Sequence, residues 1–217
     1  MAIGKTAAGL ILAGAIAAQA AQFTVRHEHL RKGCQGTMTV DASGIAFEGP
    51  KGHAFRWVYE EIQELQLSPR SVHILSYRDS KLKLGRDRAW EFTGEIPAGE
   101  LYALWRDKLD QRLIAELAAA PGAPLWSIPV KHLRSLAGSE GKLTVSDDAI
   151  VYESPKDSRT WRYQDIQNIS SSGPFDLTIT TFERPGKEFN FQLKQPITES
   201  RYNQLWLQIE KKNGRIQ

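Results

Sequence analysis

Three side chains that can bind metal ions lie close together near the start of the sequence. His27 and His29 are two residues apart, so their imidazoles would share one face of a β-strand. Cys34 follows in the same short segment, and a thiolate with imidazoles is a ligand set typical of Zn²⁺. No fourth ligand is defined, and we prefer a buried thiol beside a polar pair at a strand edge. We therefore expect no metal cofactor, and a metal-dependent enzyme built on these three residues is the weaker alternative.

A second group of candidate residues is basic and lies on an expected hairpin over residues 78–88. Its five cations are Arg78, Lys81, Lys83, Arg86 and Arg88. Five cations close together can hold a phosphate or a carboxylate. Asp79 and Asp87 partly neutralise the group, however, and lysines at the edge of a sheet also prevent sheets from pairing with each other. We prefer this protective or cross-strand role, with anion binding at the five residues as the alternative.

The rest of the sequence indicates an ordinary globular protein without a recognisable catalytic motif. It contains no motif for a serine nucleophile, a zinc protease or a dinucleotide cofactor. Hydrophobic residues make up 41% and charged residues 24%, which is typical of globular domains. The net charge of +3 is too small to indicate a nucleic-acid partner. We therefore expect a protein that is not an enzyme and does not bind nucleic acid.

The first twenty residues have the pattern of a secretory signal peptide. Lys5 supplies the positive charge, residues 7–18 form an uncharged stretch, and Ala18 and Ala20 are the small residues of a cleavage site. A retained membrane anchor is the competing interpretation, but alanine and glycine dominate the stretch and are only weakly apolar. We expect residues 1–20 to be removed. The mature protein would then be periplasmic or secreted and would have no transmembrane span.

Most of the remaining chain consists of two similar stretches in the same order. The matching pairs are Gly36–Val40 with Gly141–Val145, Ile45–Lys51 with Ile150–Lys156, and Trp57–Gln63 with Trp161–Gln167. Upstream of these, the comparison places His29 opposite His132. Residues 119–125 have the small, Pro- and Gly-rich composition of a linker. The sequence thus predicts a first domain over residues 23–118 and a second domain over residues 126–213.

The pattern within each unit predicts strands followed by one helix. Met38 and Val40 alternate with polar residues, which is typical of half-buried strands. Thr198 is the expected N-cap of the second helix. The two expected helices have apolar stripes at Leu101, Leu104, Trp105, Leu109, Leu113 and Leu117, and at Tyr202, Leu205, Trp206 and Ile209. Four aromatic side chains are expected in the cores, namely Trp57, Tyr59, Trp161 and Tyr163.

The order of these segments resembles the pleckstrin-homology-like superfamily, and most closely its GRAM and bacterial PH-like branch. The resemblance rests on the Gly-x-Leu-x-Val strand at 141–145, the aromatic-Glu pairs at 47–48 and 152–153, and the Trp-x-Tyr-x-Asp-Ile segment at 161–166. It implies a β-rich α+β fold with two small curved antiparallel sheets or barrels, each closed by a C-terminal α-helix, after the signal peptide. The loop at 41–44 lacks the basic cluster of phosphoinositide-binding members.

The resemblance implies a binding or scaffolding module. We therefore expect a non-catalytic exported protein that acts through an unknown protein or envelope component. One alternative is a carrier of a small anionic or lipid ligand, held at the basic hairpin or in a groove between the two units. The other is the metal-dependent enzyme at His27, His29 and Cys34.

Overall fold

The structure, a computed structural model, describes residues 20–29, 32–80, 85–118, 123–135, 137–183 and 186–216 of the 217-residue chain. The signal peptide predicted over residues 1–20 therefore falls almost entirely outside the described residues. Lys81 and Lys83 of the basic hairpin and residues 119–122 of the expected linker also lie outside them. Below, the first half means residues 20–118 and the second half means residues 123–216.

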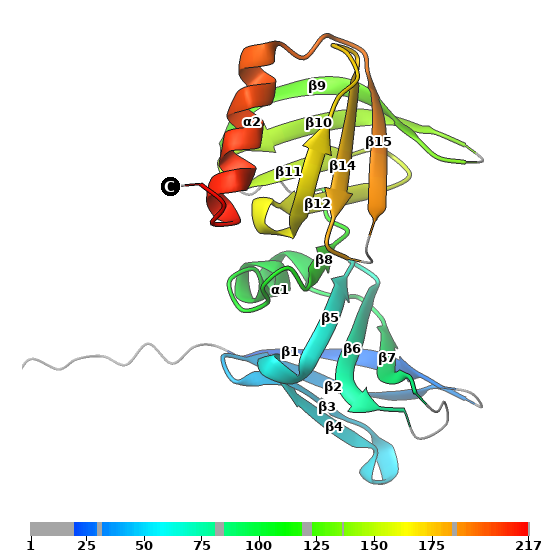
Figure 1. The fold of residues 1–217 in the computed structure, drawn as a ribbon. Coiled ribbons are helices and arrows are strands. Elements are labelled where there is room, and N and C mark those ends of the chain that lie inside the picture. The colour runs from blue at the N-terminus through cyan, green and yellow to red at the C-terminus, as the bar shows by residue number, and fades with distance from the viewer. Residues whose placement is uncertain are drawn as a thin grey trace, which may run out of the picture.

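The first half is a run of seven strands followed by a short helix and an eighth strand (Figure 1). Two single turns of 3₁₀-helix, η1 at Pro50–Gly52 and η2 at Tyr59–Glu61, interrupt the run. The strands are β1 Ala21–Glu28, β2 Cys34–Asp41, β3 Gly44–Glu48, β4 Ala54–Val58, β5 Ile62–Leu67, β6 Ser71–Asp79 and β7 Asp87–Thr93. They are followed by α1 Ala98–Trp105 and β8 Leu113–Ala115.

The second half contains seven strands and a longer helix at the C-terminal end of the chain (Figure 1). One turn of 3₁₀-helix, η3 at Tyr163–Asp165, separates its fourth and fifth strands. The elements are β9 Pro124–Leu133, β10 Ser139–Ser146, β11 Ala149–Glu153, β12 Ser158–Arg162, β13 Ile166–Ser170, β14 Asp176–Thr181, β15 Lys187–Leu193 and α2 Glu199–Lys212.

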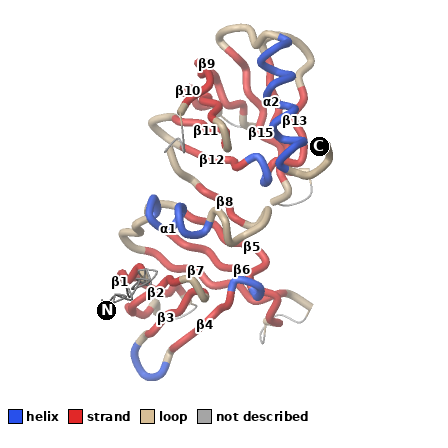
Figure 2. The backbone as a smooth tube through the Cα atoms, turned by 90° about the vertical axis from the view of Figure 1, so that its left-hand side faces the viewer, coloured by secondary structure: helices blue, strands red, loops and turns tan. Residues whose placement is uncertain are grey.

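The strands have the same spatial order in the two halves. The order is β5-β6-β7-β1-β2-β3-β4 in the first half and β13-β14-β15-β9-β10-β11-β12 in the second. Each half encloses its own cluster of buried apolar side chains. Strand β8 pairs in parallel with β5 and antiparallel with β12, so that it joins the two halves edge to edge (Figure 2). The β-rich α+β class predicted from the sequence is confirmed.

The buried aromatic residues follow the predicted alternation along the strands. Trp57 in β4 has no exposed surface, and Trp161 in β12 is 1% exposed. Tyr59 and Tyr163 open the following 3₁₀ turns and are also buried. The predicted core role of these four side chains is confirmed. Their burial removes large apolar areas from water, which is the main favourable contribution to folding in each half.

The helix predicted at the end of the first half is wrong over most of its length. Helix α1 ends at Trp105, and Leu113 lies in strand β8 instead of on the expected helical stripe. Most apolar residues of the stripe are buried as expected, since Leu109, Leu113 and Leu117 are at most 6% exposed, but Leu104 is only half-buried. Gln111, with φ of 46°, breaks the helical path, and β5 and β12 then pair with the segment that follows.

The second helix matches its predicted bounds more closely, although Trp206 of the expected apolar stripe is 38% exposed. The Thr198 side chain accepts a hydrogen bond from the backbone N–H of Arg201, as an N-cap does. Strand β9 begins at Pro124, so the last two residues of the expected linker over 119–125 belong to the sheet. None of the helices among the described residues is long and apolar enough to cross a membrane.

Candidate functional site

A cavity of about 910 Å³ opens where the two halves meet. The first half contributes the turn between β5 and β6 at Ser68–Arg70, and Glu116 from the segment after β8. The second half contributes the ends of β9 and β15 and the turn between β11 and β12. Figure 1 shows the β5–β6 turn beside the lower ends of β14 and β15. We call this cavity the junction groove.

The walls of the junction groove carry more cations than carboxylates. The cations are Arg70, Arg134, Lys156, Arg159 and Lys187, and the carboxylates are Glu116, Asp157 and Glu188. Arg134 forms an ion pair with Asp157, whereas Arg159 and Lys187 share Glu183 at 2.5 and 3.1 Å. Among the described residues, no carboxylate lies within ion-pair distance of Arg70 or Lys156. One unpaired cation therefore comes from each half.

Arg159 is held rigidly in the wall of the groove. Its guanidinium lies 4.8 Å from the ring centroid of Phe189 and 5.7 Å from that of Trp161, and its side chain is 11% exposed. Its Nε atom is buried without a hydrogen-bond partner among the described residues. A buried N–H without an acceptor costs free energy, but the burial of this atom also means that a ligand in the groove reaches it only if the side chain shifts.

His132 lies in the same wall and is neutral at pH 7. Burial lowers its pKa below the usual 6.5, and the nearby charge of Arg134 adds to the decrease. The carboxylate of Asp157, at 3.6 Å from His132 Nδ1, opposes the shift without reversing it. The positive charge of this wall therefore comes from arginine and lysine side chains.

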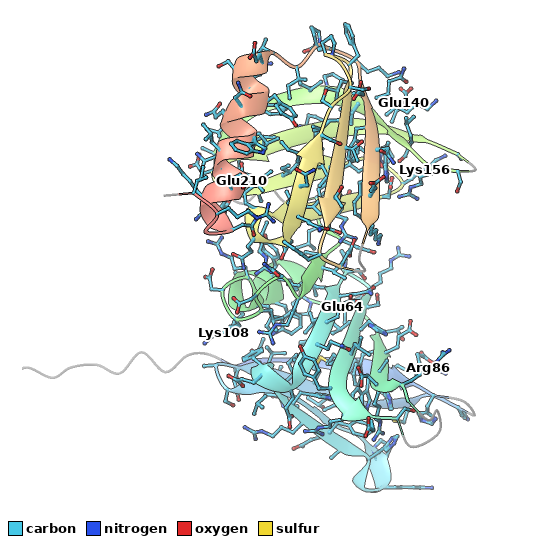
Figure 3. All side chains as sticks on the ribbon, viewed as in Figure 1. Glu64, Arg86, Lys108, Glu140, Lys156 and Glu210 are labelled. Carbon is cyan, nitrogen blue, oxygen red and sulfur yellow. The ribbon has the colours of Figure 1, made fainter. Side chains whose placement is uncertain are left out.

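The described cations of the basic hairpin predicted at residues 78–88 are Arg78, Arg86 and Arg88. Arg78 Nη2 donates to Glu61 Oε2 at 2.6 Å and to the carbonyl of Arg56 at 3.0 Å. Arg88 instead lies over the Trp90 ring, 4.7 Å from its centroid. Arg86 is exposed (Figure 3). Arg88 also lies 5.3 Å from the ring centroid of Phe55, which is next to Arg56 in β4, so the geometry of Arg78 and Arg88 is that of cross-strand contacts.

The structure does bring His27, His29 and Cys34 together, and it adds His53 to them. Burial lowers the pKa of His27 to about 4, with contributions from His53 and His29, so this imidazole is neutral at pH 7. His53 was missed because it lies 19 residues beyond Cys34, in the turn between β3 and β4. In the sequence, the only local indication of this fourth ligand was that a histidine directly follows the turn at residues 49–52.

Comparisons with known proteins identify no family for this chain. No family model matches, and no curated protein matches. Among solved structures, the C-terminal domain of an unknown protein from Leishmania infantum is 16% identical with a TM-score of 0.34, covering 51% of this chain and 95% of that chain. The Spt16D–Pob3N heterodimer is 11% identical with the same TM-score, covering 83% of this chain and 99% of that chain. At this level, neither likeness supports an argument about function.

Proposed function

We propose that this chain is a non-catalytic binding protein and that it holds an organic anion in the junction groove. The observation that carries the proposal is a cavity of about 910 Å³ whose two sides contribute Arg70 and Lys156, which have no ion-pair partner among the described residues. This volume lies within the range of about 300–1,000 Å³ that is usual for small-molecule sites. Arg70 and Lys156 would contact a carboxylate or phosphate at the two sides of the groove.

The groove also offers apolar surface for the rest of such a ligand. Leu133, the last residue of β9, lies in the wall of the groove and is 46% exposed. Phe189 lies in the same wall and is braced by the guanidinium of Arg159. A ligand with an anionic head and a short apolar portion matches this combination better than a bare inorganic ion does.

The wider proposal is an exported protein of two PH-like domains. The identical strand order of the two halves supports a duplicated unit, and the pattern of residues 1–20 supports export. In the alternative proposal, the chain acts as a scaffold for a protein or envelope component and not as a carrier. Failure of the groove to bind small anions, together with recovery of a partner from envelope extracts, would favour this scaffold.

The proposal is tested by calorimetric titration of the full chain with hexyl phosphate, inorganic phosphate and hexanol. We expect hexyl phosphate to bind more tightly than the other two, because only hexyl phosphate has both a charged head and an apolar tail. The Arg70→Gln and Lys156→Gln variants should each bind it about tenfold more weakly, since each loses one charge-assisted hydrogen bond.

Lys108→Gln is the matched control, because Lys108 is exposed at the end of α1 on the other side of the molecule from Lys156 (Figure 3). This variant should bind hexyl phosphate as the unmodified chain does. Equal binding by the Arg70→Gln, Lys156→Gln and Lys108→Gln variants, or no binding by the unmodified chain, would overturn the groove as the site.

A further inference from the structure

Four side chains with metal-binding atoms converge at one end of the first half. His27 in β1 stands directly opposite Cys34 in β2, because the two residues are paired in the antiparallel register. His29 follows the end of β1, and His53 follows the 3₁₀ turn η1 between β3 and β4. One ligand atom from each of the four residues lies within 4.8 Å of the other three. The strand order therefore brings together four side chains that no single segment of the sequence contains.

The distances within this cluster are close to those of a tetrahedral metal site. The ring centroids of His27, His29 and His53 form a nearly equilateral triangle with sides of 5.3, 5.2 and 5.4 Å. Cys34 Sγ lies 3.3 Å from His53 Nδ1. Bonds of about 2.0–2.3 Å to a central Zn²⁺ place neighbouring ligand atoms roughly 3.3–3.8 Å apart. To reach these spacings, the ligand atoms must move closer together. Side-chain rotation can supply this movement, because His29 is exposed and His53 is only half-buried.

We propose that His27, His29, Cys34 and His53 bind a transition-metal ion of the Zn²⁺ class. Three imidazoles and a thiolate supply the four ligands that a closed tetrahedral site requires. The same set disfavours Mg²⁺ and Ca²⁺, which take oxygen ligands. When the ion binds, the Cys34 thiol releases its proton to solvent and coordinates as the thiolate. With all four positions occupied by protein atoms, the site has no open position for a reacting water.

The surroundings of His27 support this assignment independently of the distances. His27 is 6% exposed, and its Nδ1 atom is buried without a hydrogen-bond partner among the described residues. Its ring packs against the rings of Phe47, Phe55 and Phe92, with centroids 5.1–5.7 Å away. These aromatic contacts fix the orientation of the imidazole, and a fixed ligand loses little conformational entropy when a metal ion binds.

The experiment is a titration of the reduced, metal-free full chain with Co²⁺, followed by displacement with Zn²⁺. We expect one Co²⁺ per chain, a thiolate-to-cobalt charge-transfer band, and loss of this band when Zn²⁺ is added. Cys34→Ser should abolish the charge-transfer band. His53→Ala should weaken Co²⁺ binding by at least about tenfold, because it removes a direct ligand.

His73→Ala is the matched control, since His73 lies in β6 of the same half and outside the cluster. Far-UV circular dichroism of each variant checks that the fold is retained. A folded His53→Ala chain with unchanged affinity would overturn the proposal. An unmodified chain that binds no Co²⁺, or binds it without a thiolate band, would overturn it equally.

Discussion

The two halves have different side chains around a histidine at the same position of the same strand arrangement. His27 pairs with Cys34 in the first half, and His132 pairs with Ser139 in the second. Each histidine also has a phenylalanine opposite it on the neighbouring strand, Phe92 or Phe191. The scaffold is therefore shared, while the side chains around the histidine decide what the position does.

In the second half, the polar groups at this position satisfy one another. Asp157 pairs with Arg134, lies 3.6 Å from His132 and accepts a hydrogen bond from Ser154 at 2.6 Å. The Tyr152 hydroxyl donates to Ser139 Oγ at 2.8 Å. Such a network needs no ion to hold it together. His132, Arg134 and Asp157 of this network also line the junction groove, where we propose that an organic anion binds.

In the first half, the residues that correspond to His132, Arg134, Ser139 and Asp157 are all potential metal ligands. His53 precedes β4 as Asp157 precedes β12, and His29 stands two residues after its paired histidine as Arg134 does. These exchanges remove both the carboxylate and its arginine partner. What remains is a set of three imidazoles and one thiol, which is a ligand set that suits a transition-metal ion.

The prediction with the largest expected effect concerns a variant in which the metal ligands of the first half are copied into the second half. The triple variant Arg134→His, Ser139→Cys, Asp157→His should bind a second Co²⁺ at the position of His132, because the backbone register is the same. Metal binding by four such ligands is worth on the order of 10 kcal/mol, so the gain should be visible as two ions per chain. A folded triple variant that still binds a single ion would show that the halves differ in backbone geometry as well.

The next prediction compares the acidic residues that end the turns η2 and η3. Asp165 pairs with the buried Arg162 at 2.5 Å, whereas Glu61 pairs with the exposed Arg78 at 2.6 Å. Arg162 also donates to the carbonyl of Leu109 in the first half at 2.7 Å. Arg162→Ala should lower the free energy of unfolding by about 3–5 kcal/mol, because it leaves a buried carboxylate unpaired.

Arg78→Ala should lower the free energy of unfolding by only about 0–1 kcal/mol, because water screens the ion pair of Arg78 with Glu61. Chemical denaturation of both variants measures the difference. Arg162→Lys is the control that keeps the positive charge and loses the bidentate geometry. Equal destabilisation by the two alanine variants would contradict the comparison of the buried and exposed pairs.

The third prediction concerns the pH dependence of the stability of the second half. Burial raises the pKa of Asp157, but hydrogen bonds from Ser154 and Ser139 and the charge of Arg134 outweigh it and hold the pKa below 3.8. The folded state therefore binds this proton less tightly than the unfolded state does. The resulting stability is present above pH 3.8 and is lost as the pH falls through the folded pKa.

Asp157→Asn should accordingly lower the free energy of unfolding by about 1 kcal/mol at pH 7. This decrease should become smaller below pH 3.8. Urea denaturation at a series of pH values measures it. A cost that stays constant down to low pH would show that the ionisation of Asp157 does not contribute to stability.

The sequence comparison and the structure disagree about which histidines correspond. Matching by residue type placed His29 opposite His132, whereas the strand register places His27 there. His27 precedes Gly36 by nine residues and His132 precedes Gly141 by nine, so the register requires no gap. The short motif His-Leu-Arg misled the alignment because three matching letters carry less information than a continuous hydrogen-bonded ladder.

Local patterns by themselves determined much of this protein. Period-two alternation predicts the strands and the burial of Trp57 and Trp161, and Thr198 marks the start of the last helix, because these features depend on neighbours in the chain. Tertiary contacts decided the rest. Leu113 became part of a strand because Leu65 of β5 pairs with it. His53 reached the other three ligands because the strand order brings distant turns to one end of the sheet. Spacing along the chain carries no record of such long-range pairing.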